Sequence, residues 1–327
     1  MKKYNLLFVF VLIVSIGFSQ VDKTILIEHY TNTKCGICAS RNPAFYNLIS
    51  NYPEVLHVSY HPSSPYPGCI FSMHNPEEND ARTNYYGIYG GTPRVVLSGS
   101  VIPIASQLLT ATQLEARLGE LSNYAVEIEQ YHGNNDTVNV ILKIKKISGS
   151  SQDNLNLYAV LAEKEIMYNA PNGETTHIDV FRRVLVNEPV TLNNVGDSIV
   201  ILQKYYPDPI WQEDEMFVVG VLQEVSSKEI LQSAKSDIAG NIMFTNYRKV
   251  EELNAVVYPN PVSDQINFIE SVKKDFIKAE LFNIYGQKIS ESDMKQSIIV
   301  NGLPSGLYVL LLTDNFNRPF TVKVQKN

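Results

Sequence analysis

The sequence has few cysteines, few charged residues and no strong excess of charge of either sign. Cysteine occurs at three of the 327 positions, charged residues make up 19% of the chain, and the formal net charge is −7. Lysine and arginine are scattered along the chain, so no basic patch marks a surface for nucleic acid or anionic lipid. We therefore expect no nucleic-acid partner.

Long hydrophobic runs are missing after the first few residues. One apolar run, residues 6–14, follows two lysines and precedes the small residues that end at Ser19. This pattern is typical of a secretory signal and is too short for a membrane-spanning helix. We predict a signal peptide over residues 1–19 that is cleaved near Ser19/Gln20, no transmembrane segment in the mature chain, and a secreted or cell-surface protein.

Two of the three cysteines, Cys35 and Cys38, are close enough in the sequence to form a small reversible disulfide. Residues 24–27 before them form an apolar, β-branched run that predicts a buried strand, and residues 41–49 carry apolar side chains at helical spacing. A thiol at a helix N-terminus has a lowered pKa, which favours thiol–disulfide exchange. A static structural disulfide is the alternative, since disulfides persist outside the cell.

The first segment, residues 20–121, alternates between predicted strands and helices. We expect a polar, proline-rich loop over residues 61–79, a short helix over residues 80–86, and a last helix opened by a capping box of Thr112 and Glu115. This order is typical of a compact α/β domain. The predicted strands are residues 24–27, 55–60, 94–97 and 101–104.

This first segment resembles a thioredoxin-fold domain. The matching features are the Cys35-Gly36-Ile37-Cys38 motif at a strand–helix junction, Pro43 five residues after the second cysteine, and Thr92-Pro93 before a hairpin. The resemblance implies that Pro93 is cis and faces the cysteine pair, so that the backbone of Thr92 is presented to an extended thiol substrate. It also implies that Cys35 is the attacking thiolate and Cys38 the resolving thiol.

The resemblance has departures, one of them at His29, and it extends to a narrower group. His29 lies where the thioredoxin family has a buried carboxylate, and a histidine can transfer protons at neutral pH. A core or rim histidine with satisfied hydrogen bonds and no such role is the alternative. The pattern is most similar to an outer-membrane-protein-28-related group of exported thioredoxin-like proteins, in which a β-sandwich follows the first domain.

The middle segment, residues 122–250, contains several strands separated by turns and no predicted helix. That texture predicts a β-sandwich. Glu163 and Arg182 fall near predicted strand edges, where charged residues are usually solvated or paired rather than catalytic.

The last segment, residues 254–327, is a small all-β module with turns at Tyr285-Gly286 and Ser305-Gly306. It resembles the type A sorting domain of the type IX secretion system, which has an Ig-like β-sandwich. The resemblance implies recognition by the type IX secretion machinery, removal of the domain near residues 250–256, and attachment to surface lipopolysaccharide or release. The predicted fold class is thus a multidomain α/β plus all-β chain.

The third cysteine, Cys69, lies in a proline-rich loop with His61 and other histidines nearby in the sequence. We expect Cys69 to be an exposed free thiol or a partner for one of the other two cysteines. A Cys/His copper site is an alternative, but the histidine spacing matches no compact ligand motif. No metal or other cofactor is predicted, and Cys69 and His61 are only weak metal candidates.

Two main functions are compatible with these features. The first is an exported thiol–disulfide oxidoreductase that acts on protein thiols or disulfides through Cys35 and Cys38. The second is a non-enzymatic surface binding or structural protein that keeps the same scaffold and an inert disulfide.

Overall fold

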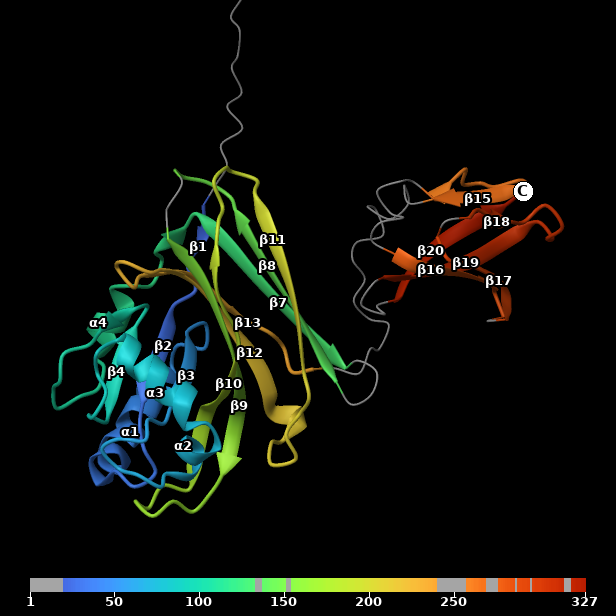
Figure 1. Ribbon diagram of the computed structural model, residues 1–327. Coiled ribbons are helices and arrows are strands. Elements are labelled where there is room, and N and C mark those ends of the chain that lie inside the picture. Colours follow the sequence, from blue (N-terminus) through green and yellow to red (C-terminus); the bar gives the residue numbers. More distant parts are fainter. Residues whose placement is uncertain are drawn as a thin grey trace, which may run out of the picture. The chain divides into compact units, whose positions relative to one another are not determined.

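The computed structural model describes residues 20–132, 137–150, 154–239, 257–268, 276–285, 287–294, 296–314 and 319–327 (Figure 1). The predicted signal peptide and the predicted removal site near residues 250–256 lie outside the described residues. The chain divides into two compact units. The first contains Met1–Gln130, Val140–Gln203 and Asp208–Ile238, and the second contains Tyr131–Asn139, Lys204–Pro207 and Ala239–Asn327.

An eight-stranded sheet forms the centre of the first unit and joins strands from both sides of residue 121. The strand β3 (Leu56–Tyr60) lies inside it, parallel to β2 (Leu26–Tyr30) on one side and to β10 (Thr176–Val190) on the other. The predicted first and middle segments therefore share one continuous sheet. Its order is β13 (Ile230–Lys235), β12 (Met216–Glu224), β9 (Leu155–Met167), β10, β3, β2, β4 (Arg94–Leu97) and β5 (Ser100–Val101).

An aromatic ladder crosses the three adjacent strands β2, β3 and β10. The ring centroids of Tyr30 and Tyr60 are 5.3 Å apart, and those of Tyr60 and Phe181 are 4.8 Å apart, both pairs being stacked. Such aromatic pairs contribute about 0.5–1.5 kcal/mol beyond the area that they bury. The pairing of β10 with β3 is short, with Val180 opposite Ser59. The stacked rings therefore strengthen a junction that has few backbone hydrogen bonds.

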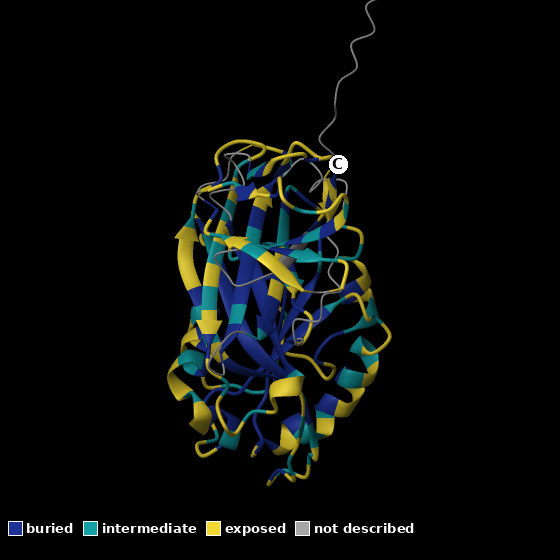
Figure 2. Cartoon of the chain, turned by 90° about the vertical axis from the view of Figure 1, so that its right-hand side faces the viewer, coloured by how far each residue is buried: buried dark blue, intermediate teal, exposed yellow. Residues whose placement is uncertain are grey.

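The two faces of the sheet carry different helices, as the alternation of side chains along each strand requires. Ile27 and its face neighbours pack against α1 (Gly36–Ile49) and α4 (Ala111–Glu115). The opposite face carries Leu26 and Tyr30 and packs against residues that end and follow α3 (Pro76–Tyr85). In Figure 2 the strands in the middle of the view are coloured mostly as buried, whereas the helices also carry exposed residues.

The sheet curls so that its two ends approach each other. The Ile230 N–H donates a hydrogen bond to the Ser98 carbonyl, and the Ser233 hydroxyl donates to the Thr24 carbonyl. Gly99 (φ +89°) forms the turn at this contact, and a Cβ added there would lie 1.8 Å from the Lys228 carbonyl oxygen. Glycine is therefore required by both the backbone conformation and the close approach.

A charged pair is buried inside the curl of the sheet. The Arg82 Nε donates to a Glu28 carboxylate oxygen at 2.6 Å, and both side chains are at least 94% buried. The Tyr86 hydroxyl donates to the other Glu28 oxygen at 2.6 Å, while the Arg82 guanidinium lies 4.1 Å from the ring centroid of Tyr158. Gln223 accepts a further hydrogen bond from Arg82 at 3.1 Å. The network therefore links β2 and α3 to β9 and β12.

A second, three-stranded sheet packs against the half of the large sheet that contains β12. Its order is β11 (Ser198–Tyr205), β8 (Val138–Lys146) and β7 (Tyr124–His132). A Cβ added at Gly220 of β12 would lie 2.7 Å from the Ile128 side chain and 3.4 Å from Leu142, so glycine permits the close approach of the two sheets. The middle segment is rich in β-strands, as predicted. Four of its strands, however, extend the sheet of the first segment: β9, β10, β12 and β13.

The second unit contains two further sheets around a separate apolar core. Ile266 and Phe268 of one sheet and Leu281, Leu310 and Val324 of the other belong to this core. One sheet has the order β14 (Val257–Tyr258), β15 (Gln265–Phe268), β18 (Ile298–Ile299), and the other has the order β17 (Lys288–Ser292), β16 (Phe276–Asn283), β19 (Gly306–Asp314), β20 (Pro319–Lys326). Residue 286 of the predicted Tyr285-Gly286 turn lies outside the described residues.

Two local predictions are wrong, and both errors concern helix starts. The predicted loop over residues 61–79 contains α2 (Ile70–His74) and the start of α3, where Asn75 caps the helix and Pro76 takes the first position. The capping box is formed by Thr110 and Gln113, two residues before the predicted pair of Thr112 and Glu115, because the helix already begins at Ala111. The short elements β1 (Val21–Asp22), β6 (Leu121–Ser122) and the 3₁₀ turn Glu213–Glu215 complete the first unit.

No helix within the described ranges is long and apolar enough to cross a membrane.

Replacing Arg82 with Ala should destabilise the whole first unit. The change leaves the Glu28 carboxylate buried without its cation, which typically costs about 3–5 kcal/mol. Unfolding should be followed through the fluorescence of Trp211, the single tryptophan, which lies in the middle segment. Arg183→Ala is the matched control, because Arg183 is exposed and its loss should cost less than about 0.5 kcal/mol. An unchanged Trp211 transition in Arg82→Ala would contradict a shared core.

Candidate functional site

The cysteine motif forms a disulfide at the N-terminus of α1. Cys35 is the N-cap residue, and its sulfur accepts a hydrogen bond from the Cys38 N–H at 3.0 Å. The preceding loop is held by Asn32, whose side-chain oxygen accepts from the Lys34 N–H at 2.9 Å. The Cys35–Cys38 bond spans 5.2 Å between Cα atoms, and neither cysteine is exposed. The predicted cysteine pair is therefore present at a helix N-terminus, but it is buried.

Thr92 and Pro93 lie beside this disulfide. The Thr92–Pro93 peptide bond is cis, and the Cys35 sulfur lies 3.7 Å from the Thr92 carbonyl oxygen. The structure thus brings together the four residues that the sequence singled out, Cys35, Cys38, Thr92 and Pro93. Their chemical roles remain predictions.

A hairpin loop from the middle segment is attached to the backbone of Cys35 and of the residues just before it. The Asn172 N–H donates to the Thr33 carbonyl at 3.1 Å, and the Asn172 side-chain amide lies 3.2 Å from the carbonyl oxygens of both Asn32 and Cys35. Asn172 lies in the β9–β10 connection, far from the cysteines in the sequence. A Pro-Asn-Gly sequence at residues 171–173 is a turn signal, but it does not indicate where the turn docks.

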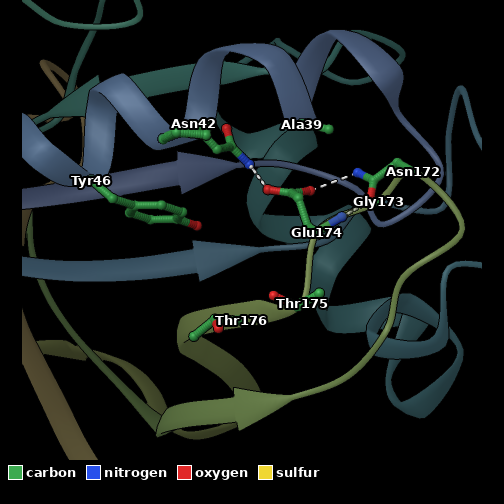
Figure 3. Close-up of a pocket in the computed structure, with 9 residues that line it drawn as sticks. Ala39, Asn42, Tyr46, Asn172, Gly173, Glu174, Thr175 and Thr176 are labelled. Carbon is green, nitrogen blue, oxygen red and sulfur yellow. Dashed lines mark hydrogen bonds between the residues drawn. The ribbon is translucent and has the colours of Figure 1, made fainter.

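A pocket of roughly 410 Å³ lies between α1 and this loop (Figure 3). Glu174 bridges its two walls, because its carboxylate accepts a hydrogen bond from the Asn42 amide at 2.7 Å and from the Asn172 amide at 2.6 Å. Asn42 also donates to the Thr31 hydroxyl at 2.9 Å. A hydrogen-bonded chain therefore runs from Thr31, which directly follows β2, through α1 to the loop beside the disulfide.

His29 is buried on the face of the sheet that α1 covers. Its ring centroid lies 4.6 Å from that of Phe45 and 5.7 Å from that of His57. Burial, followed by repulsion from His57 and His61, holds the pKa of His29 well below its usual value of 6.5. His29 is therefore neutral at pH 7. The neighbouring His57 has a charged partner: its Nδ1 lies 2.9 Å from a carboxylate oxygen of Asp179.

Cys69 is a buried free thiol, so the prediction that it is exposed or bonded to one of the other cysteines is wrong. It immediately precedes α2, packs near Phe71 and Val180, and its sulfur accepts a hydrogen bond from the Thr33 hydroxyl at 3.2 Å. The weak metal candidate His61 is also buried, with its ring 4.9 Å from that of Phe71. In the part of the chain that the structure describes, no group of three or more His, Cys, Asp or Glu side chains is arranged to hold a metal ion.

Glu163 and Arg182, which the sequence placed near strand edges, form a buried ion pair. The Arg182 Nε donates to Glu163 at 2.8 Å, and both residues are at least 96% buried. The other Glu163 oxygen accepts from the Gln212 N–H at 3.1 Å, and the Arg182 Nη1 lies 2.7 Å from His74 Nδ1. The pair connects α2 with β9 and β10, and this arrangement indicates a structural role.

The last segment of the chain matches a known domain family. Residues 256–326 match the family described as the secretion system C-terminal sorting domain. This match confirms the predicted sorting domain and supports export of the chain by type IX secretion. It also implies that this segment interacts with the secretion machinery.

The fold of the chain as a whole is similar to that of HBP35 of Porphyromonas gingivalis, with a TM-score of 0.57 and 17% sequence identity, covering 93% of this chain and 98% of that one. At this identity the likeness concerns the fold alone. A domain of the outer membrane lipoprotein Omp28 from Porphyromonas gingivalis aligns over 37% of this chain and 91% of that chain, at 12% identity and a TM-score of 0.27. No curated protein sequence matches this chain.

The buried state of His29 makes a prediction about acid stability. In the unfolded chain the His29 pKa returns to about 6.5, so the unfolded state binds more protons as the pH falls below that value and stability is lost. His29→Phe keeps a ring of similar size and removes this proton uptake. Both proteins should lose stability when the pH is lowered from about 6.5 to about 5.5. The loss in free energy of unfolding should be about 1 kcal/mol smaller for the variant than for the wild type.

Denaturant titrations at a series of pH values would measure this difference. Some acid sensitivity should persist in the variant, because the pKa of His61 is also held low by burial, then by His177 and Arg182. Identical pH profiles for wild type and His29→Phe would contradict a neutral His29 in the folded protein.

Proposed function

We propose that this chain is an exported thioredoxin-fold protein that acts as a thiol–disulfide oxidoreductase through Cys35 and Cys38. The observation that carries the proposal is the Cys35–Cys38 disulfide at the N-terminus of α1, directly beside the cis peptide bond of Thr92–Pro93. Its substrates are protein thiols or disulfides.

The topology of the first segment supports the thioredoxin-like assignment. The sheet order β3-β2-β4-β5 combines a parallel pair, β2 and β3, with two antiparallel pairs. The cysteine motif follows β2, and the cis-proline immediately precedes β4, its neighbour in the sheet. Placement in the outer-membrane-protein-28-related group is part of the same proposal.

The helix terminus supplies the activation that the reaction needs. In the reduced protein, the Cys38 N–H and the positive end of the α1 dipole stabilise a thiolate at Cys35. This thiolate attacks one sulfur of a substrate disulfide, forming a mixed disulfide and releasing the other substrate sulfur as a thiolate. Cys38, after losing its proton, then attacks the Cys35 sulfur, which forms the Cys35–Cys38 bond and releases the second substrate thiolate. The reverse sequence oxidises a substrate dithiol.

The sorting domain determines where this chemistry would take place. We place the signal-peptide cleavage near Ser19/Gln20 and the removal of the sorting domain near residues 250–256. The remaining chain would then be attached to surface lipopolysaccharide or released. This proposal is supported by the match of residues 256–326 to the sorting-domain family.

A second candidate function is a surface binding or structural protein in which the disulfide is inert. The burial of both cysteines favours this alternative, because an attacking thiol must reach one of the two sulfur atoms. The two functions differ in the stability of the bond against reduction.

The reduction potential of the Cys35–Cys38 pair, together with substrate trapping, separates the two candidates. An oxidoreductase should have a potential between about −120 and −270 mV, and Cys38→Ser should accumulate mixed disulfides through Cys35. Cys35→Ser is the control, since it removes the attacking thiol and should trap nothing. A potential below about −300 mV with no trapped species would instead identify an inert structural disulfide.

Asn172→Ala should make the disulfide easier to reach. Removing the side-chain amide removes its contacts with the Asn32 and Cys35 carbonyls, while the backbone hydrogen bond to Thr33 remains. One or two lost hydrogen bonds correspond to about a tenfold faster reaction with dithiothreitol under native conditions. The control is Asn169→Ala in the same loop, because Asn169 is exposed. Equal rates for both variants and the wild type would show that the loop does not limit access.

A further inference from the structure

The pocket between α1 and the 172–176 loop is negatively charged and has no cation of its own. Glu174 is the charged residue in its lining, and no Lys or Arg side chain among the described residues forms an ion pair with it. The hydrogen bonds to Glu174 come from the neutral amides of Asn42 and Asn172, so its charge is not cancelled. Burial and the nearby negative charges of Glu174 and Asp179 together raise the pKa of the Tyr46 hydroxyl.

The same pocket has hydrogen-bond acceptors to spare. Each Glu174 oxygen accepts one amide hydrogen and keeps further lone pairs. The hydroxyl of Tyr46 and that of Thr175 have no hydrogen-bond partner within the described ranges, and Figure 3 shows both residues around the Glu174 side chain. A lysine ammonium offers three donors and an arginine guanidinium offers five, with no acceptor. Surplus acceptors around one unpaired carboxylate are therefore complementary to a basic side chain.

The pocket lies next to the disulfide along the chain and through hydrogen bonds. Ala39, which directly follows Cys38, forms part of its wall. Asn172 contacts Glu174 with the same amide that contacts the Cys35 carbonyl. The volume of roughly 410 Å³ is within the range of about 300–1,000 Å³ for ligand sites, so it accommodates a long side chain.

We propose that this pocket binds a lysine or arginine side chain of a polypeptide whose disulfide or thiol lies at Cys35–Cys38. Glu174 is the specificity-determining residue: its carboxylate forms a charge-assisted hydrogen bond with the basic group. The reactive part of this proposal rests on the oxidoreductase function, whereas the binding of the basic side chain does not.

Two matched peptides test the substrate preference. Each contains one cystine, and they differ only in a lysine or a norleucine two residues from the reacting cysteine. The reduced wild-type protein should react about tenfold faster with the lysine peptide, and the preference should shrink as the salt concentration rises. Glu174→Gln should abolish the preference. Glu188→Gln removes the same charge from an exposed position and should keep it.

Direct binding is measured with the same lysine sequence after both cysteines are replaced by alanine. The peptide should shift the NMR amide signals of Ala39 and Gly173 in the wild-type protein, and Glu174→Gln should lose these shifts. If no exchange occurs with either cystine peptide while the binding shifts persist, the oxidoreductase function fails and the pocket assignment stands. Equal rates for both peptides in the wild type, with no binding shifts, would overturn the pocket assignment whatever the behaviour of the variants.

Discussion

The buried pair of Glu28 and Arg82 is the interaction on which the first unit depends. Removing two charges from water is costly, and their attraction offsets this cost only when the remaining donors and acceptors are satisfied. Here the partners come from distant parts of the chain: Tyr86 follows α3, Tyr158 belongs to β9, and Gln223 belongs to β12. The charges can be buried only when these elements meet. The pair thus joins the segment that contains the disulfide to the β-rich segment that follows it.

The alternation of side chains along β2 separates this charged network from the candidate site. Glu28 points to the face that the sheet curls around, and its neighbour His29 points to the face covered by α1. Two adjacent residues therefore lie in two different environments: Glu28 in a charged, hydrogen-bonded network and His29 among aromatic rings. Because α1 begins at the disulfide, the packing of His29 and Phe45 also sets the position of the helix that carries Cys38.

The sequence predicted the parts of the molecule that depend on local signals. The CGIC motif at a helix start, the proximity of Thr92-Pro93 to the cysteines and the C-terminal sorting domain were all found where expected. The docking of Asn172 on the cysteine loop and the burial of Cys69 were not predicted, because they arise from contacts between residues far apart in the sequence. The pairing of β10 with β9 contains two register shifts. The two-residue alternation of side chains along β10 is therefore interrupted, and the sequence did not predict this strand. The start of α3 was missed although Asn75-Pro76 is a local helix signal.

The parallel pairing of β3 with β10 has a consequence for any shortened form of the protein. A chain ending near residue 121 would retain the cysteines, the cis-proline and the helices α1 to α4, but β3 would become an edge strand. Its free N–H and C=O groups, together with the uncovered ring of Tyr60, would form a template for pairing with a second molecule. The β-rich segment therefore protects an edge of the sheet that would otherwise pair with other molecules. We expect a fragment that ends near residue 121 to self-associate.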